Sequence, residues 1–217
     1  MPSTDSILKQ LTTVVNEGAV FSPFVRLLLV GLVIWCILER RVLATYIAAY
    51  VGLVIMAAGM MAIGFPMDIF TFLVLFSIGL LWGREALLLP PPPRAGRARI
   101  AVAAAFALCA VFYPHFVKSV TGFKVLDVIL FAPLGMLPSP TLLFAMAAII
   151  LTKRAHTLYA LVPTWAAGAL FGGVGVFYLG VSADWVLLAG TAVSIVSYLT
   201  AEKSEPRPKG HRFKRKH

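Results

Sequence analysis

Long apolar runs separated by short polar stretches make up most of this chain. A helix needs about 20 residues, at a rise of about 1.5 Å each, to cross the roughly 30 Å hydrocarbon core of a bilayer. Seven runs meet or approach that length: 19–38, 42–63, 69–89, 100–117, 125–151, 157–179 and 183–199. The chain is therefore expected to be all-α, a polytopic transmembrane helix bundle of about seven spans.

Basic residues alternate between the connections. Fifteen of the 19 Lys and Arg follow the first, third and fifth runs or lie in the C-terminal tail. Cytoplasmic loops collect Lys and Arg, so this distribution predicts a cytoplasmic C-terminus. An alternative of six spans follows if the first run only lies in the membrane interface, and the N-terminus is then cytoplasmic too.

Three segments are expected along the chain. Residues 1–18 contain a short amphipathic stretch and are expected to form an N-terminal interfacial segment, with a frayed terminus as the alternative. Residues 19–200 form the helix bundle, and residues 201–217 form a basic tail that is predicted to be disordered. Such a tail is attracted to anionic lipid headgroups by about 1 kcal/mol for each basic residue near the surface.

Composition excludes a soluble domain. Apolar residues make up 60% of the chain, charged residues only 13%, and the mean hydropathy is +0.91. The net charge of +10 lies in loops and tail, which is a topology signal and not a nucleic-acid surface. Cys36 and Cys109 fall inside apolar runs and are expected to act as small hydrophobes. The bilayer is the expected partner, with no nucleic acid.

Enzyme signatures are absent from the sequence. There is no HExxH, no GxxxxGK[ST], no GxSxG and no paired carboxylate motif, and the four histidines are scattered. No catalytic residue, cofactor or metal ligand set is predicted, although haem ligation by His115 with a distant partner stays open. Whether the protein is an enzyme stays open as well, with a non-enzymatic role favoured.

The fourth run ends in Tyr113-Pro114-His115-Phe116-Val117-Lys118. His115 and Lys118 are candidates for a proton relay or a ligand pair, because histidine titrates near neutral pH. The favoured interpretation is that Tyr113, His115 and Lys118 anchor the span at the outer interface, where amphipathic side chains are stable.

The fifth run is interrupted by three prolines and a glycine between residues 133 and 140, so it cannot form one unbroken helix. Freed carbonyls cannot face lipid, and the break must be enclosed by protein or line a wet cavity. Broken helices of this kind bind substrates and ions in transporters. The candidate polar site consists of His115, Asp127, Ser139 and Thr141. The alternative is a break that only shapes the bundle.

The sixth run carries a small-residue face with Gly168, Gly172 and Gly173. Small residues four apart allow close approach of helices in membranes. Packing within the chain is the favoured use of this face, and contact with a membrane-protein partner or a second copy is the alternative.

Motifs in the second half of the chain resemble an uncharacterised family of small multi-span bacterial membrane proteins. They are Tyr113-Pro114, Pro138-Ser139-Pro140-Thr141, Val162-Pro163-Thr164-Trp165 with Gly168, and Gly180-Val-Ser-Ala-Asp184. The family pattern has a cysteine between the two prolines, where this chain has Ser139. The resemblance implies a multi-pass protein of the bacterial cytoplasmic (inner) membrane and supplies no substrate.

Two function classes follow from these features. The first is a small transporter or channel-like protein with a polar site at the broken fifth run. The second is a non-catalytic accessory subunit or assembly factor of a larger membrane complex. A transporter should bury polar residues in the bundle, whereas an accessory subunit should present an apolar or small-residue face.

Overall fold

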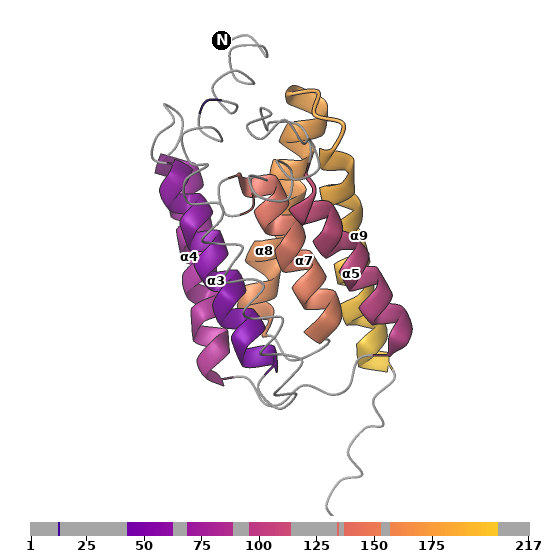
Figure 1. Cartoon of the computed structure of the whole chain (residues 1–217). Helices are drawn as coiled ribbons and strands as arrows, with labels where there is room; N and C mark the ends of the chain where they lie inside the picture. The colour runs from indigo at the N-terminus through magenta and orange to yellow at the C-terminus, as the bar shows by residue number, and fades with distance from the viewer. Residues whose placement is uncertain are drawn as a thin grey trace, which may run out of the picture.

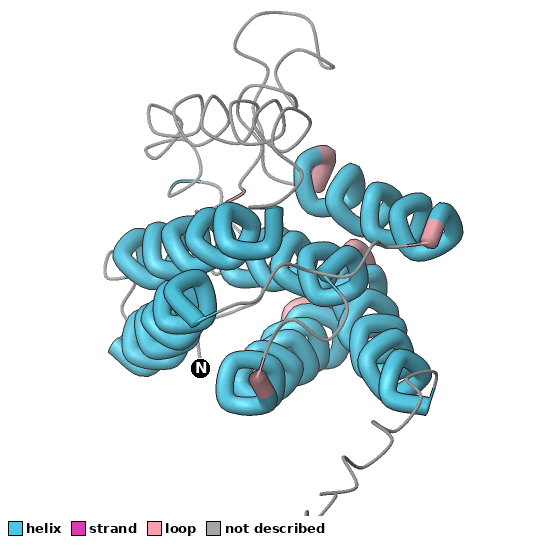
Figure 2. The backbone as a smooth tube through the Cα atoms, turned by 90° about the horizontal axis from the view of Figure 1, so that it is seen from below, coloured by secondary structure: helices cyan, strands magenta, loops and turns pink. Residues whose placement is uncertain are grey.

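The fold was obtained as a computed structural model. It describes residues 13, 43–62, 69–88, 96–113, 134, 137–152 and 157–203. Within this part of the chain all regular structure is helical and no strand occurs (Figure 2). The elements are α3 (Leu43–Ala62), α4 (Ile69–Leu88), α5 (Arg97–Val111), α7 (Pro138–Thr152), α8 (Leu158–Gly173), the π-helix η3 (Val174–Tyr178) and α9 (Asp184–Lys203).

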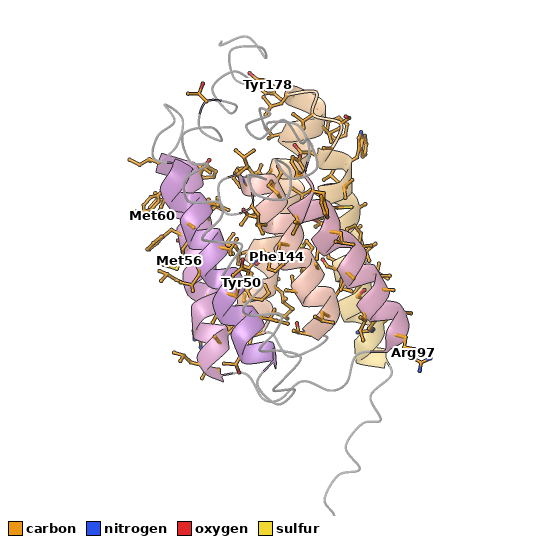
Figure 3. The ribbon with its side chains drawn as sticks, viewed as in Figure 1. Tyr50, Met56, Met60, Arg97, Phe144 and Tyr178 are labelled. Carbon is orange, nitrogen blue, oxygen red and sulfur yellow. The ribbon has the colours of Figure 1, made fainter. Side chains whose placement is uncertain are left out.

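The helices lie side by side along one axis and alternate in direction (Figure 1). Helices α3, α5 and α8 begin at the lower end of this view, and α4, α7 and α9 begin at the upper end. Figure 3 places Arg97, the first residue of α5, at the lower end and Tyr178, the last residue of η3, at the upper end. We call these two ends of the bundle the lower end and the upper end.

Helix α7 forms the centre of the bundle. It contacts α3, α5, α8 and α9, and it is buried around almost its whole circumference. A helix that is apolar on every side is stable only when other elements surround it. The side chains of Tyr50 on α3 and Phe144 on α7 point toward one another, with ring centroids 5.6 Å apart in an edge-to-face arrangement (Figure 3).

Helices α3 and α4 form a closely packed antiparallel pair. A Cβ atom added at Gly79 would lie 2.8 Å from the carbonyl oxygen of Gly52, and one at Gly59 would lie 3.2 Å from the amide nitrogen of Phe76. The two backbones can approach this closely because the contact positions carry no side chain.

The helix positions agree with the expected runs, with two differences. Helix α5 ends at Val111, not near residue 117, because the residue before Pro114 is disfavoured in helical geometry. Helix α7 begins at Pro138, since proline is well suited to the first helical turn and removes a hydrogen bond further in. Of the break expected between residues 133 and 141, the part from Pro138 onward is helical, and residues 125–133, 135 and 136 lie outside the described part.

The all-α prediction is confirmed for the described residues, whereas a seven-span bundle is not. Six α-helices are described, and two segments, Ile69–Leu88 and Leu158–Tyr178, are long and apolar enough to cross a membrane by length and composition. The expected first span and the basic tail after residue 203 lie outside the described residues, as does the N-terminal segment apart from Thr13.

Candidate functional site

A buried hydrogen bond joins Tyr113 to Asp184 at the upper end of the bundle. The phenol hydroxyl donates to Oδ1 of Asp184 at 2.5 Å, and both residues are 3% exposed. Tyr113 follows the end of α5, and Asp184 is the first residue of α9. Tyr113 therefore lies inside the protein, and the expectation that it anchors a span at the interface is wrong.

The position of Asp184 at a helix start explains how a carboxylate is accommodated there. The N-terminus of an α-helix carries partial positive charge, so an acid in the first turn is stabilised. Its backbone N–H donates to the carbonyl of Val181 at 3.0 Å, which fixes the start of the helix. The partial positive charge of the helix start and the hydrogen bond from the Tyr113 hydroxyl thus both stabilise the Asp184 carboxylate.

Gly175 makes room for the Asp184 carboxylate. A Cβ atom at Gly175 would lie only 1.6 Å from Oδ2 of Asp184, so no other residue type fits without displacing the acid. Gly175 belongs to the π-helix η3, and its carbonyl accepts the N–H of Val181 at 2.8 Å. Single π-helical turns often occur at functional sites. The turn back to α9 uses Gly180 at a φ of 69°, a region that favours glycine.

Ser139 brings a third element to the cluster. It is the second residue of α7, it is partly exposed, and its hydroxyl lies within hydrogen-bonding reach of the phenol of Tyr113. The site therefore combines the phenol of Tyr113, just after α5, with a hydroxyl from α7 and a carboxylate from α9. We call these three residues, Tyr113, Ser139 and Asp184, the upper-end cluster.

The other predicted site residues have different places. Thr141 is fully buried and donates its hydroxyl to the carbonyl of Leu137 at 2.7 Å, so it satisfies the start of its own helix. His115 and Asp127 lie outside the described residues. Of the two predicted site residues that the structure describes, Ser139 belongs to the upper-end cluster and Thr141 does not.

A groove borders the upper-end cluster. It has a volume of about 390 Å³ and passes between α5, α7 and the start of α9. Apart from the phenol of Tyr113, its walls are almost entirely apolar. They are formed by Leu108, Cys109, Phe112, Tyr113, Leu143, Ala183 and Val186. Cys109 is an exposed free thiol, which makes it a natural reporter for this groove.

The chemistry of the cluster is that of a polar binding or proton-handling site. Within the described ranges no group of three or more His, Cys, Asp and Glu side chains is arranged to hold a metal ion. The carboxylate of Asp184 accepts the phenol hydroxyl of Tyr113, beside an apolar groove. A carboxylate paired with a phenol can bind a cation or exchange a proton.

The small-residue face of α8 is used inside the bundle. A Cβ atom added at Gly168 would lie 2.5 Å from Oγ1 of Thr191. One added at Gly172 would lie 2.9 Å from the side chain of Leu188. Both neighbours belong to α9. At Gly173 an added Cβ would meet nothing within 4 Å among the described residues.

A second buried carboxylate, which the sequence did not single out, lies at the lower end. Glu85 on α4 is 1% exposed and accepts the backbone N–H of Thr157 at 2.9 Å, together with the Thr157 hydroxyl. Thr157 is the residue before α8, so Glu85 caps that helix from a neighbouring one. One turn along, the indole of Trp82 donates to Oγ1 of Thr164 at 3.0 Å.

No signal local to the sequence identifies the partners of these carboxylates, because 71 and 72 residues separate them from the groups they bind. In the sequence, Asp184 was notable only as the last residue of one motif. Three of the four motifs that carried the family resemblance nevertheless supply the upper-end cluster: the Tyr113, Ser139 and Asp184 motifs.

No family model, no curated protein and no solved structure matches this chain. The functional interpretation therefore depends on the site itself.

Proposed function

We propose that this protein is a small multi-spanning membrane transporter whose polar site is the upper-end cluster. The observation that carries the proposal is the buried hydrogen bond between Tyr113 and Asp184, with Ser139 beside it, next to an open apolar groove. A buried carboxylate is costly in an apolar surrounding and marks a functional-site candidate in membrane proteins.

Exposed apolar side chains support the membrane location. Large hydrophobic residues project from the outer surface of each described α-helix except the enclosed α7; Ile69 is 77% exposed and Leu87 is 86% exposed. Soluble proteins rarely expose so much continuous apolar surface. Lipid is the solvent in which such a surface is stable, and two helical segments have the length to span it.

Aromatic residues lie at both ends of the bundle, as membrane proteins require at the lipid headgroups. Phe177 and Trp185 are exposed at the upper end and pack edge to face with centroids 5.6 Å apart. Tyr178 lies beside them, and Tyr159, 72% exposed, lies in the first turn of α8 at the lower end.

The charge distribution supports one orientation. Arg84, Arg97 and Arg99 lie on the lower parts of α4 and α5, and the basic tail leaves the lower end of α9. In our proposal the lower end faces the cytoplasm of a bacterial cell and the upper-end cluster lies near the outer face of the inner membrane.

Burial of polar groups favours a transporter over an accessory subunit. Buried Thr141, Thr164, Thr191 and Ser194 lie inside the bundle together with the two carboxylates. The glycine face that an accessory subunit would present is covered by α9 at Gly168 and Gly172. No comparable feature of the described residues favours docking to a larger complex.

Transport is tested with purified protein in proteoliposomes on solid-supported membranes. Transient currents are recorded after exposure to inorganic cations, organic cations, amino acids and carboxylates in turn. We expect a current for one class that Asp184→Asn abolishes and that Ser182→Ala, a change at an exposed hydroxyl two residues away, retains. Silence of the wild-type protein toward every class, with correct insertion, would argue against a transporter.

Orientation is tested separately. A reporter enzyme that is active only outside the cytoplasm is fused after His217, and we expect it to be inactive. The same reporter inserted after Ser182, beside the upper-end cluster, is expected to be active. An active reporter after His217 together with an inactive reporter after Ser182 would show the opposite orientation in the membrane.

A further inference from the structure

Two arginines lie in the first turn of α5, at the lower end of the bundle. Arg97 is exposed and points away from the helices, and Arg99 follows it two positions later (Figure 3). Neither side chain forms an ion pair with an acid of the described residues. Both positive charges can therefore act on an anion that comes from outside the chain.

The guanidinium of Arg99 is held between two helices. Its Nη2 donates to the carbonyl of Ser197 on α9 at 3.2 Å. Its Nη1 is buried and has no hydrogen-bond acceptor in the described part of the chain. A buried donor without an acceptor is costly, and more so when it belongs to a charged group. Because the Arg99 side chain as a whole is partly exposed, an anion at the surface can supply this acceptor after a small side-chain movement.

The surroundings of these arginines favour a phosphate that carries an apolar tail. A guanidinium presents a planar fork of N–H donors that matches the oxygens of a phosphate. The N-terminal end of α5 adds partial positive charge, which also favours an anion. Further along the same helix, Ile100 and Val102 are 48% and 38% exposed. Apolar surface thus follows the charged turn directly, in the order of a lipid headgroup and its acyl chain.

We propose that Arg97 and Arg99 bind the headgroup phosphate of an anionic phospholipid, whose acyl chain lies along the exposed apolar residues of α5. The inference rests on the membrane location in the proposed function and is independent of transport. It differs from the attraction expected of the basic tail, because the tail acts through its net charge and this site through donors at fixed positions. Basic sites between helices at the cytoplasmic side commonly bind anionic headgroups.

Lipid binding is measured by native mass spectrometry of the full-length protein in a neutral detergent. The protein is titrated with phosphatidylglycerol or with phosphatidylcholine of the same acyl chains. Both lipids contain a phosphate, but only phosphatidylglycerol has a net negative charge. We expect phosphatidylglycerol to bind more tightly. Arg99→Gln should weaken its binding by about fivefold, and the double replacement of Arg97 and Arg99 by Gln by about twentyfold or more, because each change removes one charge near the phosphate.

Arg84→Gln is the matched control. Arg84 is also an exposed arginine near the lower end, but it lies on α4, which Figure 1 shows on the left of the bundle whereas α5 is on the right. This change removes the same charge from the protein and should leave the affinity for phosphatidylglycerol nearly unchanged. Arg99→Lys keeps the charge without the planar fork, so its affinity should be intermediate.

Several outcomes would overturn the inference. Equal affinity for the two lipids would do so, as would Arg97→Gln and Arg99→Gln variants that bind phosphatidylglycerol as tightly as Arg84→Gln does. If Arg99→Gln fails to accumulate, Arg97→Gln decides, because the Arg97 side chain has no partner among the described residues. Displacement of the lipid by millimolar inorganic phosphate would identify a soluble phosphate as the ligand and would also overturn it. Selective lipid binding without any transport current would contradict only the proposed function.

Discussion

The two ends of the bundle each hold a buried carboxylate at the start of a helix, yet the carboxylates are used differently. Glu85 accepts both the backbone N–H and the hydroxyl of one residue, Thr157, and so completes the first turn of α8. Asp184 accepts the hydroxyl of Tyr113, which follows α5, and its carboxylate leaves no room for a side chain at position 175. It also lies next to residues that line a groove.

The difference separates a structural carboxylate from a candidate functional one. A cap satisfies backbone groups that the helix leaves open, and its loss lowers stability. A carboxylate that accepts a side-chain hydroxyl near a groove can exchange that hydroxyl for a ligand. Burial alone therefore does not identify a site; the kind of donor and the neighbouring space do.

The largest effect is expected from Gly175→Ala. Its new Cβ atom would overlap Oδ2 of Asp184, and overpacking of this kind costs about 3 kcal/mol or more when the neighbour cannot move. Gly173→Ala is the matched control, because no described atom lies within 4 Å of its Cβ position, and it should be neutral or slightly stabilising. Thermal unfolding in detergent measures both; equal midpoints would show that Asp184 is not held against Gly175.

A smaller loss is expected from Glu85→Ala at the lower end. The backbone N–H and hydroxyl of Thr157 lose their acceptor, and the loss of a cap costs about 1–2 kcal/mol. Transport should survive in the protein that folds. Lost transport with unchanged stability would instead identify Glu85 as the functional carboxylate.

The smallest stability effects are expected from the two hydroxyls at the start of α7. Thr141→Ala removes a bond to the Leu137 carbonyl and should lower stability by about 1 kcal/mol with activity unchanged. Ser139→Ala should change stability by less and reduce activity, because Ser139 contacts Tyr113. An assay in which Thr141→Ala alone impairs activity would remove Ser139 from the cluster.

Much of the helical arrangement was predictable, because apolar runs of helical length indicate where a helix can form. The expected runs 42–63, 69–89 and 157–179 correspond to α3, α4 and the α8–η3 segment within about two residues. Elsewhere the helix ends differ from the apolar runs because of proline. The apolar runs continue through Pro114 and Pro138, whereas α5 ends before Pro114 and α7 begins at Pro138.

The candidate site was predictable only in part. The prolines in the fifth run indicated Ser139 as a candidate, because irregular backbone in an apolar segment must be enclosed by protein or line a cavity. Thr141 is equally polar, but helical geometry turns its hydroxyl to its own backbone. The pairing of Tyr113 with Asp184 depends on how α5 and α9 meet in space, and neither residue carries a local signal for that contact.

The most direct measurement of the central claim compares Asp184→Asn with Glu85→Gln in one preparation, with stability and activity recorded together. Both changes are close in shape and remove one buried negative charge. We predict that Asp184→Asn remains folded and loses transport, while Glu85→Gln unfolds at a lower temperature and retains transport. If Asp184→Asn keeps full activity and only loses stability, the upper-end cluster is a structural feature and the account is wrong.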